Sequence, residues 1–526
     1  MKEFQPDGQQ PRQEHEIEVK FNCDLGLFPE VLKLVEPIAV SSVQIKNLES
    51  TYFDTADLRL HNAGVSVRMR TDDSGKSLCG FKSVDHGANS TFGRIQIEVP
   101  MRGPQPKLDQ LGPVAGPWLE GIIGQDELSP QFVVCVQRKL IVIKHVTSEI
   151  EIAMDSGIVQ GKEQQVLFFE LELEFKSGDE RHLYDFAMLL ARKFLLTLNF
   201  VTKSERGFRT MGKQPPKWVS VQSSRPIANL AFDQLLTISA SRALGHFTSN
   251  WAALLEGFEP EAAHQMRIAL RGFRDLTDIY NAAFPCPDFR RLQQMARNVG
   301  KSLGQERSLD VLRRHLGTFQ ILPRLELPEL RALTAIAEDY HVRSYEAART
   351  AIRAEATTQF VLEAQNFILQ IPERYQTGQH VANDSTAPNG ILAEKTLERL
   401  HKGILKRGRS LTKLSDEKLH ALRLKVKAMR CATNMFPGLG RSKLKATSYA
   451  QIIGQLQKTL GAHNDNVFAL VFLRSVAKTD RVDAKMCAKQ LIRKIKRADK
   501  HELTKLNTIW KKFKNSETYW EPLVLV

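Results

Sequence analysis

The chain has 526 residues, of which 42% are hydrophobic, and a formal net charge of +15 at pH 7. This length exceeds what one hydrophobic core supports and predicts two to four domains. No apolar run approaches the roughly 18 residues of a membrane span, and the polar N-terminus lacks a secretory apolar segment. The six cysteines form no CxxC pair. We therefore expect a cytoplasmic protein with reduced thiols, no membrane partner, no disulfide framework and no zinc site.

The charge is distributed unevenly along the chain. Residues 1–213 contain 25 Lys and Arg against 30 Asp and Glu, a net charge of −5. The remainder contains 49 basic and 29 acidic residues, a net charge of +20. A basic surface of this kind attracts nucleic acid, anionic membranes or polyphosphate.

The first region alternates apolar and polar residues with the period of two that is typical of strands. Strands are predicted at 15–22, 48–54, 64–71, 76–83, 93–99, 132–138, 140–145, 148–155 and 166–176. Helical patterns interrupt this series at 28–36 and 180–196. Many short strands separated by turn residues predict a barrel or a sandwich.

A stretch rich in Pro and Ser, "GKQPPKWVSVQSSRP" at 212–226, reads as a linker, and the period then changes to 3.6. Helices are predicted at 228–256, 260–283, 287–304, 307–316, 327–372, 390–411, 415–436, 447–461, 464–476 and 482–514. The polar loop "QTGQHVANDSTAPNG" at 376–390 divides this helical region into two halves.

The two helical halves repeat one another. The segment "HQMRIALRGFR" at 264–274 matches "HALRLKVKAMR" at 420–430, and "KSLGQERSLDV" at 301–311 matches "KTLGAHNDNVF" at 458–468. Two matched segments in the same order indicate an internal duplication.

The strand "HEIEVKF" at 15–21 carries Glu16, Glu18 and Lys20 on one face and hydrophobic residues on the other. Alone, this pattern is typical of a half-exposed strand with solvated charges. The other strands and the segment "TKSERGF", however, repeat the arrangement. They place charged residues on alternating positions at Arg68, Arg70, Lys82, Arg94, Glu98, Arg138, Glu151, Asp155, Glu170, Glu172, Glu174, Lys203 and Arg206.

The faces opposite these charges are strongly apolar and need cover. A closed barrel with charges inside and helices packed outside satisfies both faces. Its interior would suit a polyanion together with divalent cations. Carboxylates are ligands for Mg²⁺ or Mn²⁺, whereas Arg and Lys bind phosphate oxygens.

The first region resembles the CYTH domain of the triphosphate tunnel metalloenzymes. The similarity covers residues 14–210 and rests on "EIEVK", "YFDTADLRLHNAGVSVRMR" at 52–70, "ELELE" at 170–174 and "KSERG" at 203–207. The resemblance implies an eight-stranded antiparallel tunnel that hydrolyses triphosphate substrates with a divalent metal. One departure is Gln96, where the family often has an acid.

The resemblance also implies roles for individual residues. Catalytic roles fall to Glu16, Glu18, Lys20, Arg68 and Arg70. The implied metal ligands are Glu16, Glu18, Asp155, Glu170, Glu172 and Glu174. The implied substrate contacts are Lys20, Arg68, Arg70, Lys82, Arg94, Arg138, Lys203 and Arg206.

In the helical region, two basic stripes share the spacing of one helix face. The first stripe is His264, Arg267, Arg271 and Arg274, and the second is His420, Arg423, Lys427 and Arg430. One such stripe alone is typical of a solvated basic face. Two equivalent stripes within a net charge of +20 favour a bound polyanion.

These helices resemble the CHAD domain, a conserved-histidine helical domain, over residues 228–515 with halves at about 228–375 and 390–515. The resemblance implies two helical bundles around a basic face that binds long-chain polyphosphate, joined to the first domain by a linker at 211–227. Ser308 stands where the family usually has Asp. Nucleic acid is a rival ligand, but the stripes lack interleaved aromatic residues that could stack on bases. A scaffold for acidic proteins is a third alternative.

The sequence thus predicts an α+β barrel domain followed by an all-α domain of two duplicated bundles. The expected function is a metal-dependent inorganic triphosphatase that converts tripolyphosphate to pyrophosphate and phosphate. The enzymatic alternative is a hydrolase or cyclase acting on thiamine triphosphate or nucleoside triphosphates. The non-enzymatic alternative is a polyphosphate-binding protein.

Overall fold

The computed structural model describes residues 14–84, 91–113, 115–161, 164–212, 217–220, 232–257, 260–283, 285–303, 327–376, 389–435, 443–478 and 482–520. The chain forms two compact units. The first comprises residues 1–218, 248–257 and 352–370, and the second comprises residues 219–247, 258–351 and 371–526. Among the described helices, none combines the length and the apolar character that crossing a membrane requires.

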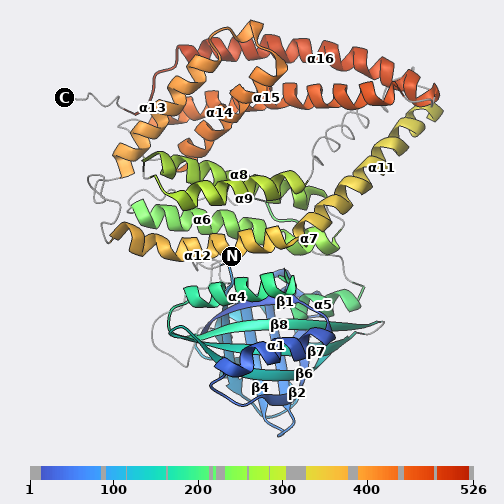
Figure 1. Cartoon of the computed structure of the whole chain (residues 1–526). Coiled ribbons are helices and arrows are strands. Elements are labelled where there is room, and N and C mark those ends of the chain that lie inside the picture. Colours follow the sequence, from blue (N-terminus) through green and yellow to red (C-terminus); the bar gives the residue numbers. More distant parts are fainter. Residues whose placement is uncertain are drawn as a thin grey trace. The chain divides into compact units, whose positions relative to one another are not determined.

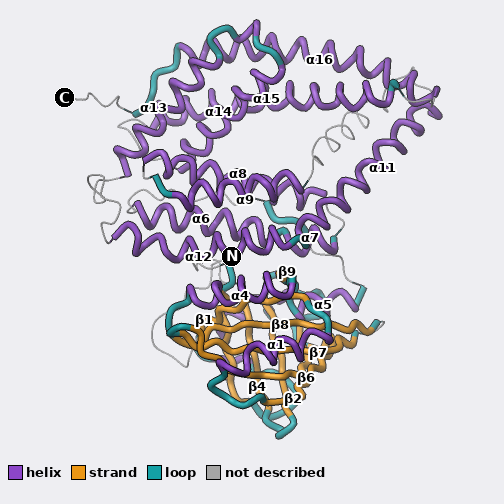
Figure 2. The backbone as a smooth tube through the Cα atoms, viewed as in Figure 1, coloured by secondary structure: helices purple, strands orange, loops and turns teal. Residues whose placement is uncertain are grey.

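Eight antiparallel strands close into a barrel in the first unit (Figures 1 and 2). They are β1 (Glu14–Asn22), β2 (Gln44–Asp54), β3 (Val65–Asp72), β4 (Ser77–Val84), β5 (Gly93–Pro100), β6 (Ser129–His145), β7 (Ser148–Gln160) and β8 (Gln165–Ser177). Neighbours follow the order β5–β4–β3–β2–β6–β7–β8–β1, and the pairing of β1 with β5 closes the sheet. The two-residue strand β9 (Thr197–Leu198) pairs with the end of β1. The predicted eight-stranded antiparallel barrel is confirmed.

Strand β6 is continuous, whereas the sequence predicted separate strands at 132–138 and 140–145. Its first part pairs with β2, and its pairing with β7 runs without a break from Val133 to His145. The alternation of side chains is interrupted where Leu140 and Ile141 are both buried. The prediction was wrong because it followed side-chain alternation, while the backbone hydrogen bonds to β7 continue through the interruption.

Helices cover the apolar outer faces of the strands. The predicted helices at 28–36 and 180–196 are confirmed as α1 (Phe28–Val35) and α4 (Arg181–Phe194). Helix α4 packs on β7 and β8. Its apolar side chains recur every three or four residues, so that Leu183, Phe186 and Leu190 are buried on one face.

Two further helices in this unit were not predicted. They are α2 (Arg59–Asn62), a single turn, and α3 (Ala115–Ile123). Leu119 of α3 belongs to the same buried cluster as Val67, Phe81 and Ile97, which project from the outer faces of β3, β4 and β5. The glycines and proline of the α3 segment argue against a helix in the sequence. The helix forms because this packing stabilises it.

The segment "TKSERGF" was grouped with the alternating strands, but it is the helix α5 (Lys203–Thr210). The Thr202 side chain accepts a hydrogen bond from the Glu205 backbone, and the Glu205 side chain accepts one from the Thr202 backbone. This reciprocal cap fixes the start of the helix. Lys203 and Arg206, three residues apart, therefore lie on one helical face.

The second unit is all helical, as predicted. Its helices are α6 (Phe232–Ser249), α8 (Pro260–Ala283), α9 (Pro287–Ser302), α11 (Leu327–Ile352), α13 (Asn389–Arg407), α14 (Asp416–Met435), α15 (Lys443–Val476) and α16 (Val482–Lys514). One of its cores joins Leu333 of α11, Leu473 of α15 and Leu491 of α16.

Two helix boundaries differ from the prediction. The predicted helix at 327–372 is divided at Arg353 and Ala354 into α11 and α12 (Glu355–Gln376). The predicted helices at 447–461 and 464–476 are one continuous helix, α15. The predicted helix at 307–316 and most of the loop at 376–390 lie outside the described residues.

The first unit also contains two segments from the helical region. Helix α12 lies against α4 and β9: Asn366 Nδ2 donates to Asp185 Oδ1 at 2.7 Å, and the backbone N–H of Leu198 donates to Thr358 Oγ1 at 3.2 Å. Helix α7 (Trp251–Glu256) places the ring of Trp251 5.0 Å from that of Phe200. These contacts make α7 and the first part of α12 part of the barrel's unit.

Candidate active site

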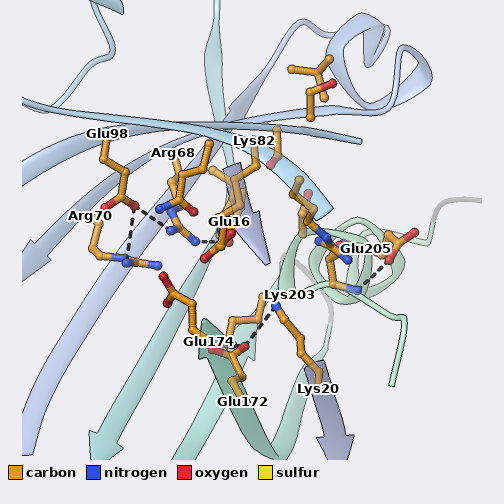
Figure 3. Close-up of a pocket in the computed structure, with 18 of the residues that line it drawn as sticks. Glu16, Lys20, Arg68, Arg70, Lys82, Glu98, Glu172, Glu174, Lys203 and Glu205 are labelled. Atoms are coloured by element: carbon orange, nitrogen blue, oxygen red, sulfur yellow. Dashed lines mark hydrogen bonds and ion pairs between the residues drawn. The ribbon is translucent and has the colours of Figure 1, made fainter. Parts of the chain in front are cut away.

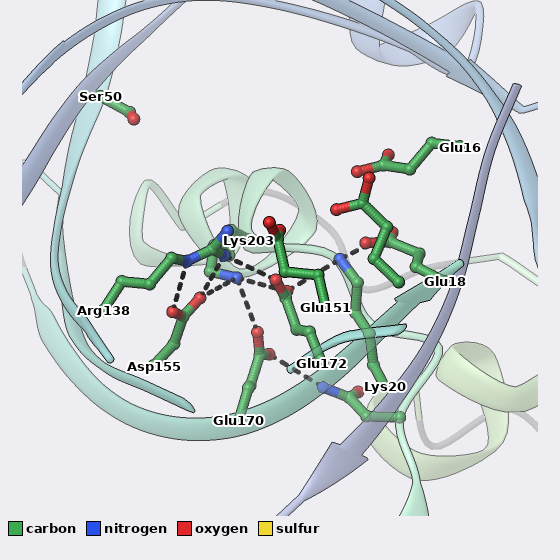
Figure 4. A network of polar contacts seen from close by, with 12 residues as sticks. Glu16, Glu18, Lys20, Ser50, Arg138, Glu151, Asp155, Glu170, Glu172 and Lys203 are labelled. Atoms are coloured by element: carbon green, nitrogen blue, oxygen red, sulfur yellow. Dashed lines mark hydrogen bonds and ion pairs between the residues drawn. The ribbon is translucent and has the colours of Figure 1, made fainter. Parts of the chain in front are cut away.

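Charged side chains from β1 and from β3 to β8 gather inside the barrel (Figures 3 and 4). They surround a cavity of about 360 Å³. The predicted residues that line it are Glu16, Lys20, Arg68, Arg70, Lys82, Arg94, Arg138, Glu172, Glu174 and Lys203. Glu18, Asp155 and Glu170 lie behind this wall in contact with lining bases, and Arg206 contacts Glu170.

Strand β1 turns its charges inward. Val19 and Phe21 are fully buried on its outer face, while Glu18 is only 5% exposed on the inner face. Glu18 Oε1 lies 2.9 Å from Lys20 Nζ. Burial alone would raise the pKa of Glu18, but the charges of Lys20 and Lys82 lower this pKa to about 2. Glu18 is therefore an ionised carboxylate at neutral pH.

Three buried carboxylates, Asp155, Glu170 and Glu172, form the acidic triad of the tunnel. Their oxygens lie within 4.8 Å of one another. Asp155 on β7 is directly opposite Glu170 on β8, and Glu172 follows two residues later on the same face. Carboxylate oxygens are the ligands that Mg²⁺ and Mn²⁺ prefer, so the donor set fits either ion.

The other predicted metal ligands form a second acidic group. Glu174 is directly opposite Glu18. Burial and, to a smaller extent, the negative charge of Glu16 raise the pKa of Glu174 to about 7. Lys20 lies between the two acidic groups, with its Nζ 2.9 Å from Glu18 and 3.1 Å from Glu172.

Basic side chains contact the acidic triad from several sides (Figure 4). Arg138 makes two hydrogen bonds of 2.7 Å to Asp155 and one of 2.6 Å to Glu172. Lys203 Nζ lies 2.9 Å from Asp155, 3.0 Å from Glu170 and 2.7 Å from Glu172. Burial would lower the pKa of Lys203, but these three carboxylates raise it well above its ordinary value.

The predicted pair Arg68 and Arg70 lies beside Glu98 (Figure 3). Arg68 Nη2 donates to Glu98 Oε1 at 2.9 Å, and its Nη1 lies 3.3 Å from the Tyr52 hydroxyl. Burial opposes the charged form of Glu98, but Arg68 and Arg70 lower its pKa to about 2. A Cβ at Gly80 would come within 3.3 Å of Arg68 and Glu98, so the glycine leaves room for this pair.

Two further bases complete the wall. Lys82 donates a 2.5 Å hydrogen bond to Glu16, and Arg94 Nε lies 3.7 Å from Glu18. Gln96 lines the cavity between them, and its Oε1 accepts no hydrogen bond from any described residue. The departure noted in the sequence therefore places a neutral amide in the tunnel.

Sequence reasoning placed Glu98 and Glu151 on the inward faces of their strands but assigned them no role. It missed Lys176, although this residue lies two positions after Glu174 and the spacing could have found it. Tyr52 carried no comparable signal, because its role depends on pairing with Arg68 across strands. Asn199, which donates to Glu170 at 2.9 Å, lies outside every predicted strand.

In the second unit, the eight predicted stripe residues lie on α8 and α14, which contact each other. Burial and, to a smaller extent, the positive charge of the neighbouring Arg423 lower the pKa of Arg271 to about 10. The two stripes thus meet at Arg271 and Arg423. His420 Nδ1 lies 2.6 Å from Asn464 Oδ1 on α15. Sequence reasoning missed Asp275, whose pKa burial raises to about 6 despite the nearby Arg271.

Comparison with known proteins identifies two families along the chain. Residues 14–207 match the CYTH domain and residues 239–474 match the CHAD domain. An inorganic triphosphatase of Haemophilus influenzae is 24% identical over 203 residues, which are 38% of this chain. The match spans only 56% of that relative's length.

Two solved structures show similarity to separate parts of the chain. A CHAD domain from the plant Ricinus communis covers 57% of this chain and 98% of its own, with 25% identity and a TM-score of 0.48. A Hippeastrum protein, described as a candidate adenylyl cyclase with a dominant triphosphatase activity, covers 37% of this chain and 96% of its own, with 16% identity and a TM-score of 0.27. Along the chain, a match to the CYTH domain over residues 14–207 is thus followed by a match to the CHAD domain over residues 239–474.

Proposed function

We propose that the barrel is the active site of a metal-dependent inorganic triphosphatase, which converts tripolyphosphate and water into pyrophosphate and phosphate. The observation that carries this proposal is the gathering of an acidic triad and several Arg and Lys side chains around one enclosed cavity. Acids suited to a divalent metal and bases suited to phosphate are the two components that hydrolysis of a phosphoanhydride requires. The match to a relative named inorganic triphosphatase supports the same reaction.

The metal would be Mg²⁺ or Mn²⁺, which supplies charge neutralisation on phosphate oxygens and lowers the pKa of the attacking water. The residues proposed to hold it are Glu16, Glu18, Asp155, Glu170, Glu172 and Glu174. The low pKa of Glu18 keeps this ligand ionised at neutral pH.

The basic residues hold the substrate and stabilise the products. We assign binding of phosphate oxygens to Lys20, Arg68, Arg70, Lys82, Arg94, Arg138, Lys203 and Arg206. Water oxygen forms a bond to a terminal phosphorus while the bridging P–O bond breaks, and pyrophosphate leaves with the electron pair. The bases neutralise the negative charge that develops on the transferred and leaving groups. This scheme assigns no side chain as a dedicated general base.

The lining favours an inorganic substrate over an organic triphosphate. Its described aromatic rings are Tyr52 and His61. Tyr52 stacks on Phe132 at 4.8 Å and contacts Arg68, while the His61 ring lies tilted against that of Phe208, with the ring centres 4.1 Å apart. Both rings are therefore engaged, which leaves a nucleobase or thiamine ring little to stack on within the described lining.

A substrate comparison tests this function. The full-length protein would be incubated with tripolyphosphate, ATP, thiamine triphosphate or long-chain polyphosphate, each with Mg²⁺ or Mn²⁺, and the products would be followed by phosphorus NMR. We expect the highest kcat/KM for tripolyphosphate, with equal amounts of pyrophosphate and phosphate. A preference for ATP or thiamine triphosphate would select the alternative enzyme, and binding without turnover would select a non-catalytic polyphosphate-binding protein.

We further propose that the helical region binds long-chain polyphosphate through its two stripes. The proposed limits are residues 14–210 for the tunnel domain, 211–227 for the linker and 228–515 for the helical domain. The contact between α8 and α14, with the charge of the buried Arg423 acting on Arg271, supports one shared basic site, where an extended anion would relieve the repulsion between like charges.

Titration of long-chain polyphosphate against a stripe variant tests this second proposal. Changing Arg267, Arg271, Arg423 and Lys427 to alanine in the full chain should weaken binding at least tenfold and reduce its dependence on salt. A matched control replaces four exposed bases of α16, namely Lys489, Arg493, Lys496 and Lys500. Equal losses in the two variants would indicate attraction to net charge alone, and equal competition by single-stranded DNA would favour the nucleic-acid alternative.

A further inference from the structure

Lys203 occupies the middle of the acidic triad. Its Nζ lies within 3.0 Å of all three carboxylates, at distances of 2.9, 3.0 and 2.7 Å. These contacts are buried, because the side chains of Asp155, Glu170 and Lys203 are 0, 1 and 10% exposed. An ammonium group therefore stands where these oxygens would bind a divalent cation (Figure 4).

The charges around the triad are already balanced without a metal. Its three carboxylates contact Lys203, and they are also contacted by Arg138, Arg206 and Lys20. A divalent ion that arrived alone would add two positive charges to a buried site that already has four bases for three acids. The desolvation and repulsion would strongly oppose its binding.

A free triphosphate meets the opposite obstacle, because the bases that would bind it are engaged with carboxylates. A metal and a triphosphate arriving together remove both obstacles. Each carboxylate then exchanges an ammonium or guanidinium partner for the metal, and each base exchanges a carboxylate for a phosphate oxygen. Every charge that enters the tunnel is paired.

We propose that Lys203 excludes divalent metal from the triad until triphosphate arrives, so that the tunnel binds the metal–triphosphate complex rather than either component alone. This inference rests on the triphosphatase function proposed above. Lys203 suits the role because the Thr202–Glu205 cap fixes its backbone at the start of α5, while its long side chain can turn from carboxylate to phosphate.

Binding measurements on the full-length protein test the coupling. Calorimetric titrations would use Mn²⁺ alone, imidotriphosphate (a slowly hydrolysed analogue) with EDTA, and both together, while electron paramagnetic resonance counts free Mn²⁺. We expect the metal–analogue complex to bind at least tenfold more tightly than the analogue alone. Linkage requires that the protein-bound analogue bind Mn²⁺ more tightly than the free analogue does, by the same factor.

Two variants separate Lys203 from a general effect of charge. Lys203→Gln should strengthen binding of Mn²⁺ alone at least tenfold and reduce the coupling. Lys144→Gln is the matched control: it removes the same charge at an exposed position of β6, outside the tunnel. It should leave binding of Mn²⁺ alone close to that of the wild type. Thermal unfolding checks that both variants fold.

The outcomes distinguish a failure of this inference from a failure of the triphosphatase function on which it rests. If imidotriphosphate binds the wild type equally well with and without Mn²⁺, the exclusion by Lys203 is wrong while the triphosphate site stands. If the analogue binds under neither condition, the proposed function itself fails. If Lys144→Gln strengthens Mn²⁺ binding as much as Lys203→Gln, net charge and not occupation of the triad controls the metal. If Lys203→Gln does not fold, a lack of coupling in the wild type would still refute the inference.

Discussion

At the scale of single residues, the tunnel consists of paired charges rather than isolated ligands. Arg68 is held by Glu98 and Tyr52, Lys82 by Glu16, and Arg138 by Asp155. Removing one member of a buried pair leaves the other charge without compensation, which costs on the order of 3–5 kcal/mol. Loss of activity in a single variant therefore reflects both substrate binding and stability, and the two need separate measurement.

Arg68→Ala should lower kcat/KM for tripolyphosphate by about tenfold to a hundredfold, because it removes a charge-assisted contact worth roughly 1.5–3 kcal/mol. The double variant Arg68→Ala/Glu98→Gln removes the orphaned carboxylate charge and should recover stability without recovering activity. Lys144→Ala, at an exposed position of β6, is the matched control. Steady-state kinetics with thermal unfolding measure both effects, and wild-type kcat/KM in a folded Arg68→Ala would refute the assignment.

The sequence could predict which side chains point inward, but not which of them pair. Alternation along one strand places Glu16, Glu18 and Lys20 on a single face whatever the fold. The contact between Arg68 and Glu98 depends on the registers of β3, β4 and β5, which bring residues 30 positions apart together. A single sequence carries no signal for that register, so Glu98 was placed on an inward face without its partner Arg68, and Tyr52 was not recognised as part of the site.

At the scale of elements, α5 is decisive because it carries Lys203 and Arg206 into the barrel. Its segment was grouped with the strands for its charged residues alone, although Lys203 and Arg206 are three positions apart, a spacing that fits a helix and not a strand. The pattern Thr202-x-x-Glu205 was the available signal, since this spacing forms a capping box. The strands were predictable because each repeats its alternation over several residues, whereas one short helix does not repeat its period often enough to be recognised.

Gly207→Ala should displace α5 and lower both the unfolding temperature and triphosphatase activity. A Cβ at this position would overlap the ring of Phe132, and overpacking of this kind costs about 1–3 kcal/mol. Gly121→Ala in α3 is the matched control, because nothing lies within 4 Å of its added Cβ. That variant should be neutral or stabilised by about 0.5–1 kcal/mol. If both glycines tolerate alanine equally, α5 does not pack as described.

At the scale of the whole molecule, the proposed triphosphate ligands lie between residues 16 and 206, but the compact unit that contains them extends further. Helix α12 bonds to Asp185 and to the backbone of Leu198, and Trp251 of α7 contacts Phe200. The composition of the sequence predicted a linker near 212–226. It could not reveal that later helices return to the barrel, because such contacts depend on the tertiary fold.

A fragment of residues 1–212 should therefore keep triphosphatase activity but unfold at a lower temperature than the barrel unit of the full chain. It retains every proposed ligand and loses the contacts of α7 and α12. Calorimetry measures the unfolding temperature, and turnover of tripolyphosphate measures the activity. Complete loss of activity in a folded fragment would show that the helical region contributes to the site.

The central claim is that the tunnel hydrolyses triphosphate with a metal held by its carboxylates. Metal-dependent turnover of tripolyphosphate by full-length Glu18→Gln tests it most directly, because the change removes one ligand charge with almost no change in volume. Glu49→Gln, at an exposed position of β2, is the matched control. We expect turnover by Glu18→Gln to fall at least a hundredfold at saturating Mg²⁺ or Mn²⁺, with an unchanged fold and a fully active Glu49→Gln. Near-normal turnover by folded Glu18→Gln at saturating metal would contradict the account.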